Sequence, residues 1–351
     1  MKIISKKLIA HIFLTTIARL WARKKNIVFY APVKFHALHL LPVIHEMQNN
    51  PFFKITLVGC FEDIETLSGL PKFPFLNELP IYNRYDVFIM TEITLPWGLR
   101  GKKVFFGHGI GPKLNYQSSS SLNDFESIFV PCLPMYQAQQ SLQPTLFKIG
   151  LPLLDNPTLS DNQSTNIQKT FKIDSDKPTI VYAPSWSDEE HLISDVELNI
   201  ERLSSLINFN VIISPHPNLL NPNKFTKSSL FENPVLPLNT PASDISTFEL
   251  CLLADIVISD ISSLLFESMA IDKMVLFDGN HQIYKACGAD EVLTNVCNAI
   301  PTIDWKLDLE NQIALLQDNY DYQKMKSFIQ SYLFNQGTAT KEFIKSIYKL
   351  C

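Results

Sequence analysis

The chain has 351 residues, of which 46% are hydrophobic and 19% are charged. It can bury a sizeable core and is longer than one compact domain usually is, so we expect two domains. The net charge of -5 argues against nucleic acid as a partner, because binding to a polyanion depends on clustered Lys and Arg.

The cysteines show no paired C-x-x-C spacing, so neither a zinc site nor a disulfide framework is expected. They are Cys60, Cys132, Cys251, Cys287, Cys297 and Cys351. The first three lie in or beside apolar segments. We therefore expect reduced, buried thiols in a cytoplasmic protein.

Residues 1–25 are expected to form an amphipathic helix. Their apolar stretch is shorter than the ~20 residues needed to span a bilayer, and basic residues follow where a signal peptide would have its cleavage site. Basic residues flank the stretch: Lys2, Lys6, Lys7, Arg19, Arg23, Lys24 and Lys25. This pattern favours a helix on an anionic membrane surface, peripheral at the inner face of the cell membrane. A helix packed on its own domain has the same pattern and remains an alternative.

From residue 26 onwards, strand-like and helix-like segments alternate, which indicates α/β domains with mostly parallel sheets. In the first half, a helix is predicted at 35–47 and strands at 26–31, 54–60, 85–92, 102–107, 127–132 and 147–155. Residues 157–176 are polar and rich in Asn, Ser and Thr, which is typical of a linker region.

In the second half, strands are predicted at 177–185, 209–217, 235–238, 254–260 and 273–279, and helices follow Trp305. The order predicts two Rossmann-like domains facing a central cleft, at 26–156 and 177–335, and a C-terminal helix at 336–351. In such sheets, ligands bind where the carboxyl ends of strands turn into helices.

Two histidines follow predicted strands. His108 lies between Gly107 and Gly109, with Lys113 close behind, and would act as a general base for an acceptor hydroxyl. His216 is held between two prolines and would stabilise charge on a phosphate oxygen. A histidine that only satisfies a turn is the alternative in both places.

Two further strand ends have residues suited to a nucleotide. Pro184 and Ser185 end a strand, and Trp186 would form a wall of a nucleotide pocket or belong to the core. After the strand at 254–260, Ser262 and Ser263 would offer backbone N–H groups and hydroxyls to a phosphate at the start of a helix.

The residues around this serine pair have alternatives too. Asp260 or Ser262 would also serve as a plain N-cap. Glu267, one helical turn beyond Ser263, would accept hydrogen bonds from a ribose or glycerol hydroxyl, or lie on the helix surface. No acidic cluster indicates a metal ligand, so none is predicted, although a pyrophosphate donor would be compatible with a loosely held Mg²⁺.

Taken in order, "GHGIGPK", "GLPLLD", "KPTIVYAPSW", "SPHPN" and "SDISS" resemble the successive motifs of the CDP-glycerol glycerophosphotransferase family, the teichoic-acid type polymerases and primases. The resemblance implies a GT-B fold, with an N-terminal acceptor domain and a C-terminal domain that holds the nucleotide. By position, His108 and His216 match two active-site histidines of the family. Ser262 and Ser263 match its serine pair near the donor phosphates.

The chain departs from the family's pattern at Ser187 and Leu153, where the family commonly has arginine, which implies fewer bidentate phosphate contacts. The resemblance implies transfer of glycerol phosphate, or a related polyol phosphate, from a CDP-activated donor to a polysaccharide or lipid-linked acceptor. Alternatives are a GT-B glycosyltransferase that uses a UDP- or CMP-sugar, an isomerase resembling the UDP-N-acetylglucosamine 2-epimerases, and a non-catalytic nucleotide-binding homologue.

Overall fold

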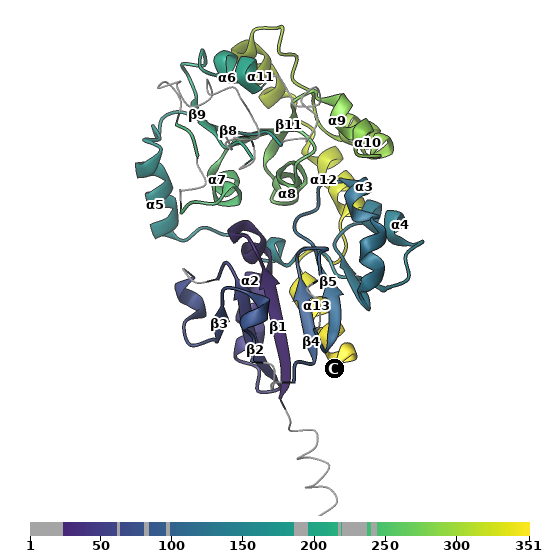
Figure 1. Ribbon diagram of the computed structural model, residues 1–351. Coiled ribbons are helices and arrows are strands. Elements are labelled where there is room, and N and C mark those ends of the chain that lie inside the picture. Colours follow the sequence, from purple (N-terminus) through teal and green to yellow (C-terminus); the bar gives the residue numbers. More distant parts are fainter. Residues whose placement is uncertain are drawn as a thin grey trace, which may run out of the picture.

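The apolar segments predicted as strands form two separate parallel sheets, stacked as lower and upper lobes in Figure 1. This computed structural model describes residues 24–61, 64–80, 84–95, 99–185, 196–216, 219, 237–239 and 244–351. Residues 1–23 of the predicted amphipathic helix and Trp186 lie outside these ranges. None of the helices in the described part combines the length and apolar composition that a membrane crossing needs.

The first sheet has seven parallel strands in the order β3-β2-β1-β4-β5-β6-β7. They are β1 (Lys25–Ala31), β2 (Phe53–Gly59), β3 (Lys72–Phe73), β4 (Val87–Met90), β5 (Lys102–Phe105), β6 (Ser127–Val130) and β7 (Thr145–Lys148). The strand order reverses between β1 and β4, where Ile27 pairs with Val87. Such a reversal opens a crevice at the carboxyl ends of the two strands.

The second sheet has four parallel strands in the order β11-β10-β8-β9, and its order reverses between β8 and β10. They are β8 (Thr179–Ala183), β9 (Asn210–Ile213), β10 (Ile256–Ser259) and β11 (Met274–Phe277). The strand predicted at 235–238 is represented in the described residues only by an isolated bridge between Ile213 and Leu238. Two strand reversals therefore open crevices, one in each domain.

Helices connect the strands as the alternating pattern predicts. In the first domain they are α2 (Lys34–Gln48), α3 (Leu114–Gln117) and α4 (Leu133–Gln139), with 3-10 turns at Glu65–Leu67, Leu76–Glu78, Ser120–Asp124 and Pro152–Leu154. In the second they are α6 (Val196–Leu203), α7 (Thr247–Leu253), α8 (Ser263–Ala270), α9 (His281–Ala286), α10 (Asp290–Ala299) and α11 (Leu309–Asp318).

The segment predicted as a linker, 157–176, contains helix α5 (Asp161–Thr170). Ser160 begins it with a capping box: its hydroxyl accepts from the backbone N–H of Gln163, whose side chain accepts from the backbone N–H of Ser160. Ile167 is the buried residue of this polar helix. The segment is polar because its helix is exposed and buries a single residue, Ile167. The Asn, Ser and Thr content is typical of a loop, so the sequence did not predict this helix.

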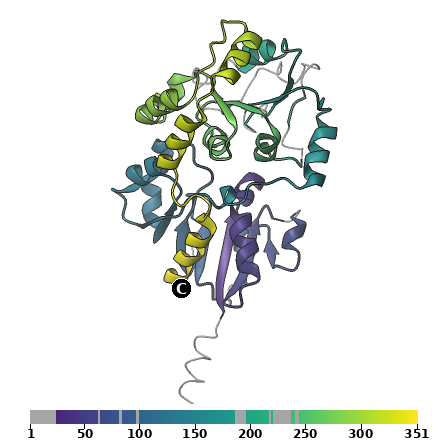
Figure 2. The same cartoon turned by 180° about the vertical axis from the view of Figure 1, so that it is seen from behind.

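The chain returns to the first domain through α12 (Tyr322–Tyr332) and α13 (Ala339–Leu350), as Figure 2 shows. The Asp155 carboxylate accepts hydrogen bonds from the backbone N–H groups of Ala339 and Thr340, at 2.9 and 2.7 Å, and so fixes the start of α13. Phe343 packs edge-on against Phe106 and Phe129. Helix α13 therefore completes the core of the first domain.

The core of the first domain also continues into the second. The apolar cluster that contains the strands of the first sheet also includes Leu265 and Phe266 of α8 and Ile261, which lies just before this helix. Phe266 stacks on Tyr332 of α12, with ring centroids 4.5 Å apart. The two domains are thus packed against each other as well as facing each other across a cleft.

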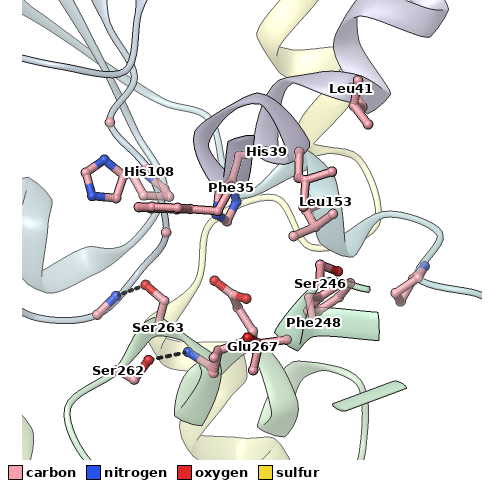
Figure 3. Close-up of a pocket in the computed structure, with 18 of the residues that line it drawn as sticks. Phe35, His39, Leu41, His108, Leu153, Ser246, Phe248, Ser262, Ser263 and Glu267 are labelled. Carbon is pink, nitrogen blue, oxygen red and sulfur yellow. Dashed lines mark hydrogen bonds between the residues drawn. The ribbon is translucent and has the colours of Figure 1, made fainter. Parts of the chain in front are cut away.

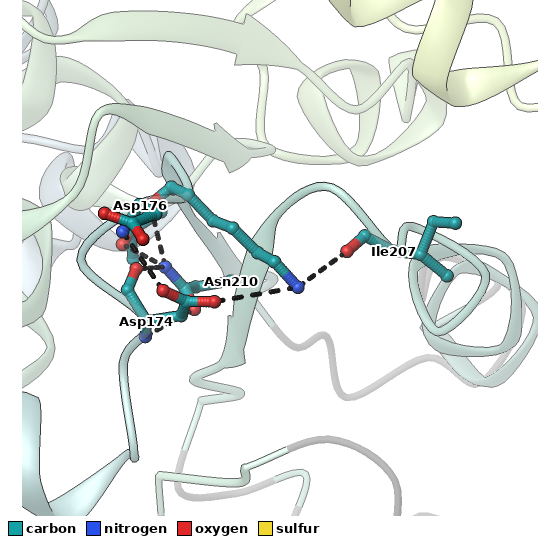
Figure 4. Close-up of polar contacts among 6 residues, drawn as sticks. Asp174, Asp176, Ile207 and Asn210 are labelled. Carbon is teal, nitrogen blue, oxygen red and sulfur yellow. Dashed lines mark hydrogen bonds and ion pairs between the residues drawn. The ribbon is translucent and has the colours of Figure 1, made fainter.

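A polar network closes the edge of the second sheet (Figure 4). The Asn210 side chain at the start of β9 donates to the backbone oxygens of Asp174 and Lys177, and accepts from the backbone N–H of Asp174. Lys177 Nζ donates to the Ile207 carbonyl oxygen at 3.0 Å. These contacts fix the turn that enters β8.

The cysteines differ in part from the expectation of buried thiols. Cys132 and Cys251 are buried, and burial raises the pKa of each thiol to about 12. Cys60 is exposed, contrary to the prediction, because it lies just beyond the end of β2. Its Sγ is 3.0 Å from the Pro32 carbonyl oxygen.

Candidate active site

A cavity of about 570 Å³ lies between the two strand reversals and is lined from both domains (Figure 3). Most residues predicted for the site line it: Gly107, His108, Gly109, Lys113, Pro184, Ser185, His216, Ser262, Ser263 and Glu267. Two predicted residues are not among its lining. Trp186 lies outside the described residues, and Asp260 is completely buried beneath the cavity wall.

The loop after β5 carries His108 and depends on its glycines. Gly107 and Gly109 have φ values of 70° and 77°, in the left-handed region that favours glycine. A Cβ on Gly109 would lie 2.0 Å from Ser263 Oγ, and one on Gly111 would lie 2.7 Å from the Ile261 carbonyl oxygen. Glycine is therefore needed here for the close approach of the second domain as well as for the turn.

Ser263 joins the two domains. Its Oγ accepts hydrogen bonds from the backbone N–H groups of Ile110 and Gly111, at 2.7 and 2.8 Å. The sequence predicts a phosphate contact for this hydroxyl, but here its oxygen accepts from the first domain and only its hydrogen is left to donate to a ligand. Ser262 is the N-cap of α8 and accepts from Leu264 N at 3.4 Å.

Asp260 organises the strand ends instead of contacting the cavity. One carboxylate oxygen accepts from the backbone N–H and the hydroxyl of Ser185, both at 2.9 Å, and the other accepts from Ser262 N at 3.0 Å. Burial raises the pKa of Asp260, while these hydrogen bonds oppose the rise. The carboxylate thus ties the end of β8 to the end of β10.

Glu267 faces the cavity from α8 and is 2% exposed, so the surface alternative for this residue is wrong. Its Oε1 has no hydrogen-bond partner among the described residues. Burial raises its pKa to about 8, so the carboxyl is protonated at neutral pH. A protonated carboxyl donates a hydrogen bond as well as accepting one, which suits a ligand hydroxyl.

His108 and His216 both contact the ring of Phe35 in α2. The Phe35 ring centroid is 5.6 Å from that of His108 and 6.4 Å from that of His216. The backbone N–H of His216 donates to the Pro184 carbonyl oxygen, which fixes the loop after β9. Burial is the main cause that lowers the pKa of His108 to about 4, so its imidazole is neutral at physiological pH and can accept a proton.

Sequence reasoning missed two histidines and their neighbours. His36 and His39 lie on the buried face of α2, and burial lowers their pKa values to about 2 and about 3. His36 stacks on His108, with ring centroids 3.7 Å apart and planes at 17°. Thr91 and Glu92 follow β4 and contact His36. The sequence does contain a signal for them. His36 and His39 lie one helical turn apart in α2, the helix that follows β1, where the strand order reverses.

His36, Glu92 and His108 bring three potential ligand atoms within 4.8 Å of one another. A metal ion requires the lone pairs of its ligands to converge on one point. The lone pairs of an imidazole lie in the ring plane, and these two rings are nearly parallel, so their lone pairs run side by side. The trio has the geometry of a hydrogen-bonded stack, and we assign no metal ligand to it.

Comparison with known proteins gives a consistent answer. The model of the CDP-glycerol:poly(glycerophosphate) glycerophosphotransferase family matches residues 126–344, more than half of the chain. A teichoic acid glycerol-phosphate primase of Bacillus spizizenii is 22% identical over 212 residues, which cover 58% of this chain and 52% of the relative. The chain spans about half the length of the curated relatives that it matches.

Solved structures of similar fold cover nearly the whole chain. The wall teichoic acid polymerase TagF has a TM-score of 0.66 at 17% identity, over 98% of this chain and 96% of that one. One TagF structure was obtained after a 15-minute soak with CDPG. The complex of S. aureus MnaA with UDP has a TM-score of 0.59 at 13% identity, over 93% of this chain and 98% of that one. The predicted GT-B arrangement of two parallel α/β domains is confirmed.

Proposed function

Because the chain belongs to the CDP-glycerol:poly(glycerophosphate) glycerophosphotransferase family, we propose that it transfers glycerol phosphate, or a related polyol phosphate, from a CDP-activated donor to a hydroxyl group. The acceptor is a cell-surface polymer or a lipid-linked saccharide. One observation carries the proposal: His108 of the first domain and His216 of the second line one cavity, and both rings contact Phe35.

The transfer is a displacement at phosphorus. The acceptor oxygen attacks the phosphorus that bears glycerol, and its proton passes to His108, whose neutral imidazole has a lone pair to receive it. The bond between that phosphorus and the bridging oxygen of the pyrophosphate breaks, and CMP leaves with the bonding electrons. An imidazolium at His216 and the hydroxyl groups of Ser262 and Ser263 would stabilise the charge on the departing phosphate.

The donor is oriented by the second domain. The start of α8, at Ser262, gives a phosphate the positive end of a helix dipole. Glu267, protonated at neutral pH, donates a hydrogen bond to a hydroxyl of the donor. The CDPG soak of TagF supports the choice of a cytidine donor over a uridine donor.

The test compares ligands and products. We expect CDP-glycerol and CMP to raise the melting temperature more than UDP-N-acetylglucosamine and UDP, and CMP to be released in the presence of an acceptor. His108→Gln should keep donor binding and lose turnover. Selectivity for uridine nucleotides, or release of UDP, would contradict the proposal and favour a glycosyltransferase.

Ser262→Ala is the sharper variant for the phosphate contact. Ser263→Ala also removes the acceptor of two backbone N–H groups of the first domain, so its effects on binding and on domain packing are mixed. Ser262→Ala removes only the cap to Leu264 and should weaken CMP binding. Unchanged CMP affinity in this variant would remove Ser262 from the donor site.

We also propose that residues 1–25 bring the protein to an anionic membrane surface from the cytoplasmic side. The basic residues around an apolar stretch support this placement. Deleting residues 1–25 should abolish sedimentation with vesicles that contain anionic lipid. Sedimentation of the shortened chain at the level of the full chain would contradict this placement.

A further inference from the structure

We propose that His36 is a positioning residue for the base: with Thr91 it holds the His108 imidazole in one orientation and in the tautomer that leaves the lone pair on Nε2 to accept the proton. The proposal rests on the proposed function for its catalytic consequence, but its structural content concerns only this chain. His36 is 2% exposed, lies at the start of α2 and stacks on His108 at a centroid distance of 3.7 Å.

Thr91 determines the tautomers of both rings. The Thr91 hydroxyl lies 3.2 Å from the Tyr30 carbonyl oxygen, which can only accept, so the single hydroxyl hydrogen is directed there. The Thr91 Oγ1 must then accept from His36 Nδ1, which lies 3.2 Å away. His36 Nδ1 therefore carries the proton, and Glu92 Oε1 lies 3.5 Å from the same nitrogen.

The same argument fixes the ring of His108. Its Nδ1 lies 3.3 Å from the Thr91 carbonyl oxygen, and a carbonyl oxygen accepts but never donates. His108 Nδ1 therefore carries the proton of the neutral ring, and the lone pair is on Nε2. One residue, Thr91, thus takes the Nδ1–H of both stacked imidazoles, one through its hydroxyl and the other through its carbonyl.

The stack prevents the His108 ring from turning over. A ring flip would exchange Nδ1 with Cδ2 and Nε2 with Cε1, and so would take Nδ1 away from the Thr91 carbonyl oxygen. The nearly parallel His36 ring closes one face of His108, while Phe35 lies edge-on at 5.6 Å. The electron-rich face of a neutral His36 also favours the imidazolium that His108 becomes after it accepts the proton. His36 is not among the residues that line the cavity, so both effects act through His108 and not on the substrate.

Other ionisable groups surround His36 and His108 and are the same in the wild type and in the His36 variants. Glu92 Oε1 lies 3.5 Å from His36 Nδ1, the other Glu92 oxygen lies 3.5 Å from the Tyr116 hydroxyl, and His39 follows His36 on the same helix. Lys113 acts on His108 from its own loop, and His216 and Glu267 line the cavity from the second domain.

The direct test reads the tautomer of His108 in the full chain labelled with ¹⁵N-histidine, without any ligand. Long-range ¹H–¹⁵N correlation spectra distinguish protonation at Nδ1 from protonation at Nε2, and the His108 signals are identified by their loss in His108→Gln. The wild type should show His108 protonated at Nδ1. His36→Ala should give a mixture of tautomers, whereas His36→Phe keeps a flat ring and should keep the wild-type form.

Kinetics gives the second readout. A base held in the wrong orientation affects the chemical step, so we expect His36→Ala to lower kcat by about 10- to 100-fold with KM for the donor nearly unchanged. His36→Phe should recover most of this loss. The same exchange at His281, an exposed histidine of α9 that stacks on Phe277 and is not among the residues that line the cavity, is the matched control and should change neither readout.

Unchanged His108 signals in His36→Ala would overturn the proposal, as would equal losses of kcat in the Ala and Phe variants with the tautomer unaltered. If His36→Ala does not fold, Thr91→Val against Thr91→Ser tests the same contact, since only serine keeps the hydroxyl. If the wild type turns over no CDP-glycerol while His36→Ala still loses the Nδ1–H form, the proposed function fails and the positioning role stands.

Discussion

Replacing Glu267 by Gln should make the free energy of unfolding less sensitive to alkaline pH. Glu267 is 2% exposed, its Oε1 has no hydrogen-bond partner among the described residues, and burial raises its pKa from 4.5 to about 8. Glutamine has nearly the same shape but does not titrate in this range. The comparison therefore isolates the proton of Glu267 from the packing of its side chain.

The magnitude follows from the two pKa values. The folded protein holds the proton more tightly than the unfolded chain, so its stabilising contribution is fully present below pH 4.5 and is lost as the pH rises through about 8. At about 1.4 kcal/mol for each pH unit, the interval from 4.5 to about 8 corresponds to about 5 kcal/mol of unfolding free energy. About 3 kcal/mol of this is already lost at neutral pH.

The assay is urea unfolding of the wild type and Glu267→Gln at a series of pH values from about 5 to about 9, where the carboxyl titrates in the folded protein. The difference between the two proteins at each pH removes the titration of groups that they share. We expect the variant to gain stability relative to the wild type by about 3 to 4 kcal/mol across the series. Glu46→Gln, on the exposed side of α2, is the matched control.

A constant difference between wild type and Glu267→Gln over the whole series would refute the reasoning. It would mean that Glu267 is ionised in the folded protein, and therefore that its carboxylate has a partner that offsets the effect of burial. Glu46→Gln should show a difference close to zero at every pH.

Three further predictions concern other parts of the molecule. Gly109→Ala should lower the melting temperature well below that of Gly337→Ala. Both glycines have φ above 70°, but only at Gly109 would the new Cβ meet an atom of the other domain, Ser263 Oγ. Equal melting temperatures of the two variants would show that Gly109 is needed only for its backbone conformation. Asn210→Ala should reduce the free energy of unfolding in urea by about 1–3 kcal/mol, because it leaves backbone groups of the turn before β8 without partners. The affinity for CMP should not change. A loss of CMP affinity would show that contacts at this edge of the second sheet affect the cavity. Burial lowers the pKa of His39 from 6.5 to about 3, so on acidification the unfolded chain takes up this proton at a higher pH than the folded protein, and the free energy of unfolding falls below pH 6.5. His39→Phe should lose less stability over the same range of pH. Identical acid profiles of the two proteins would show that His39 is not buried in its neutral form.

The strands and the loops of the site could be predicted because both depend on local sequence. Apolar runs that end in Gly, Pro or Ser mark the carboxyl ends of parallel strands, and the loops of His108, His216 and Ser262 are of this kind. Strand β3 has only two residues, Lys72 and Phe73, and no periodicity can identify so short a segment.

The contact of Ser263 with the first domain, the burial of Glu267 and the stacking of His36 on His108 could not be predicted, because each depends on contacts between distant segments. Ser263 accepts from backbone N–H groups more than a hundred residues earlier, and Glu267 belongs to a helix, α8, that packs against the first domain as well as against α7 of its own domain. His36 and His108 meet because the strand order reverses between β1 and β4. A helix glutamate or a helix histidine looks the same in the sequence whether its face meets solvent or another domain.

Helix α13 has a consequence for how the protein is made. The strands of the first sheet are synthesised early, but the helix that covers Phe106 and Phe129 is synthesised only after the whole second domain. While the second domain is being translated, this part of the first core has no cover and exposes aromatic side chains to water. Of these two domains, the one whose strands are synthesised earlier is therefore completed later, after the other has been translated.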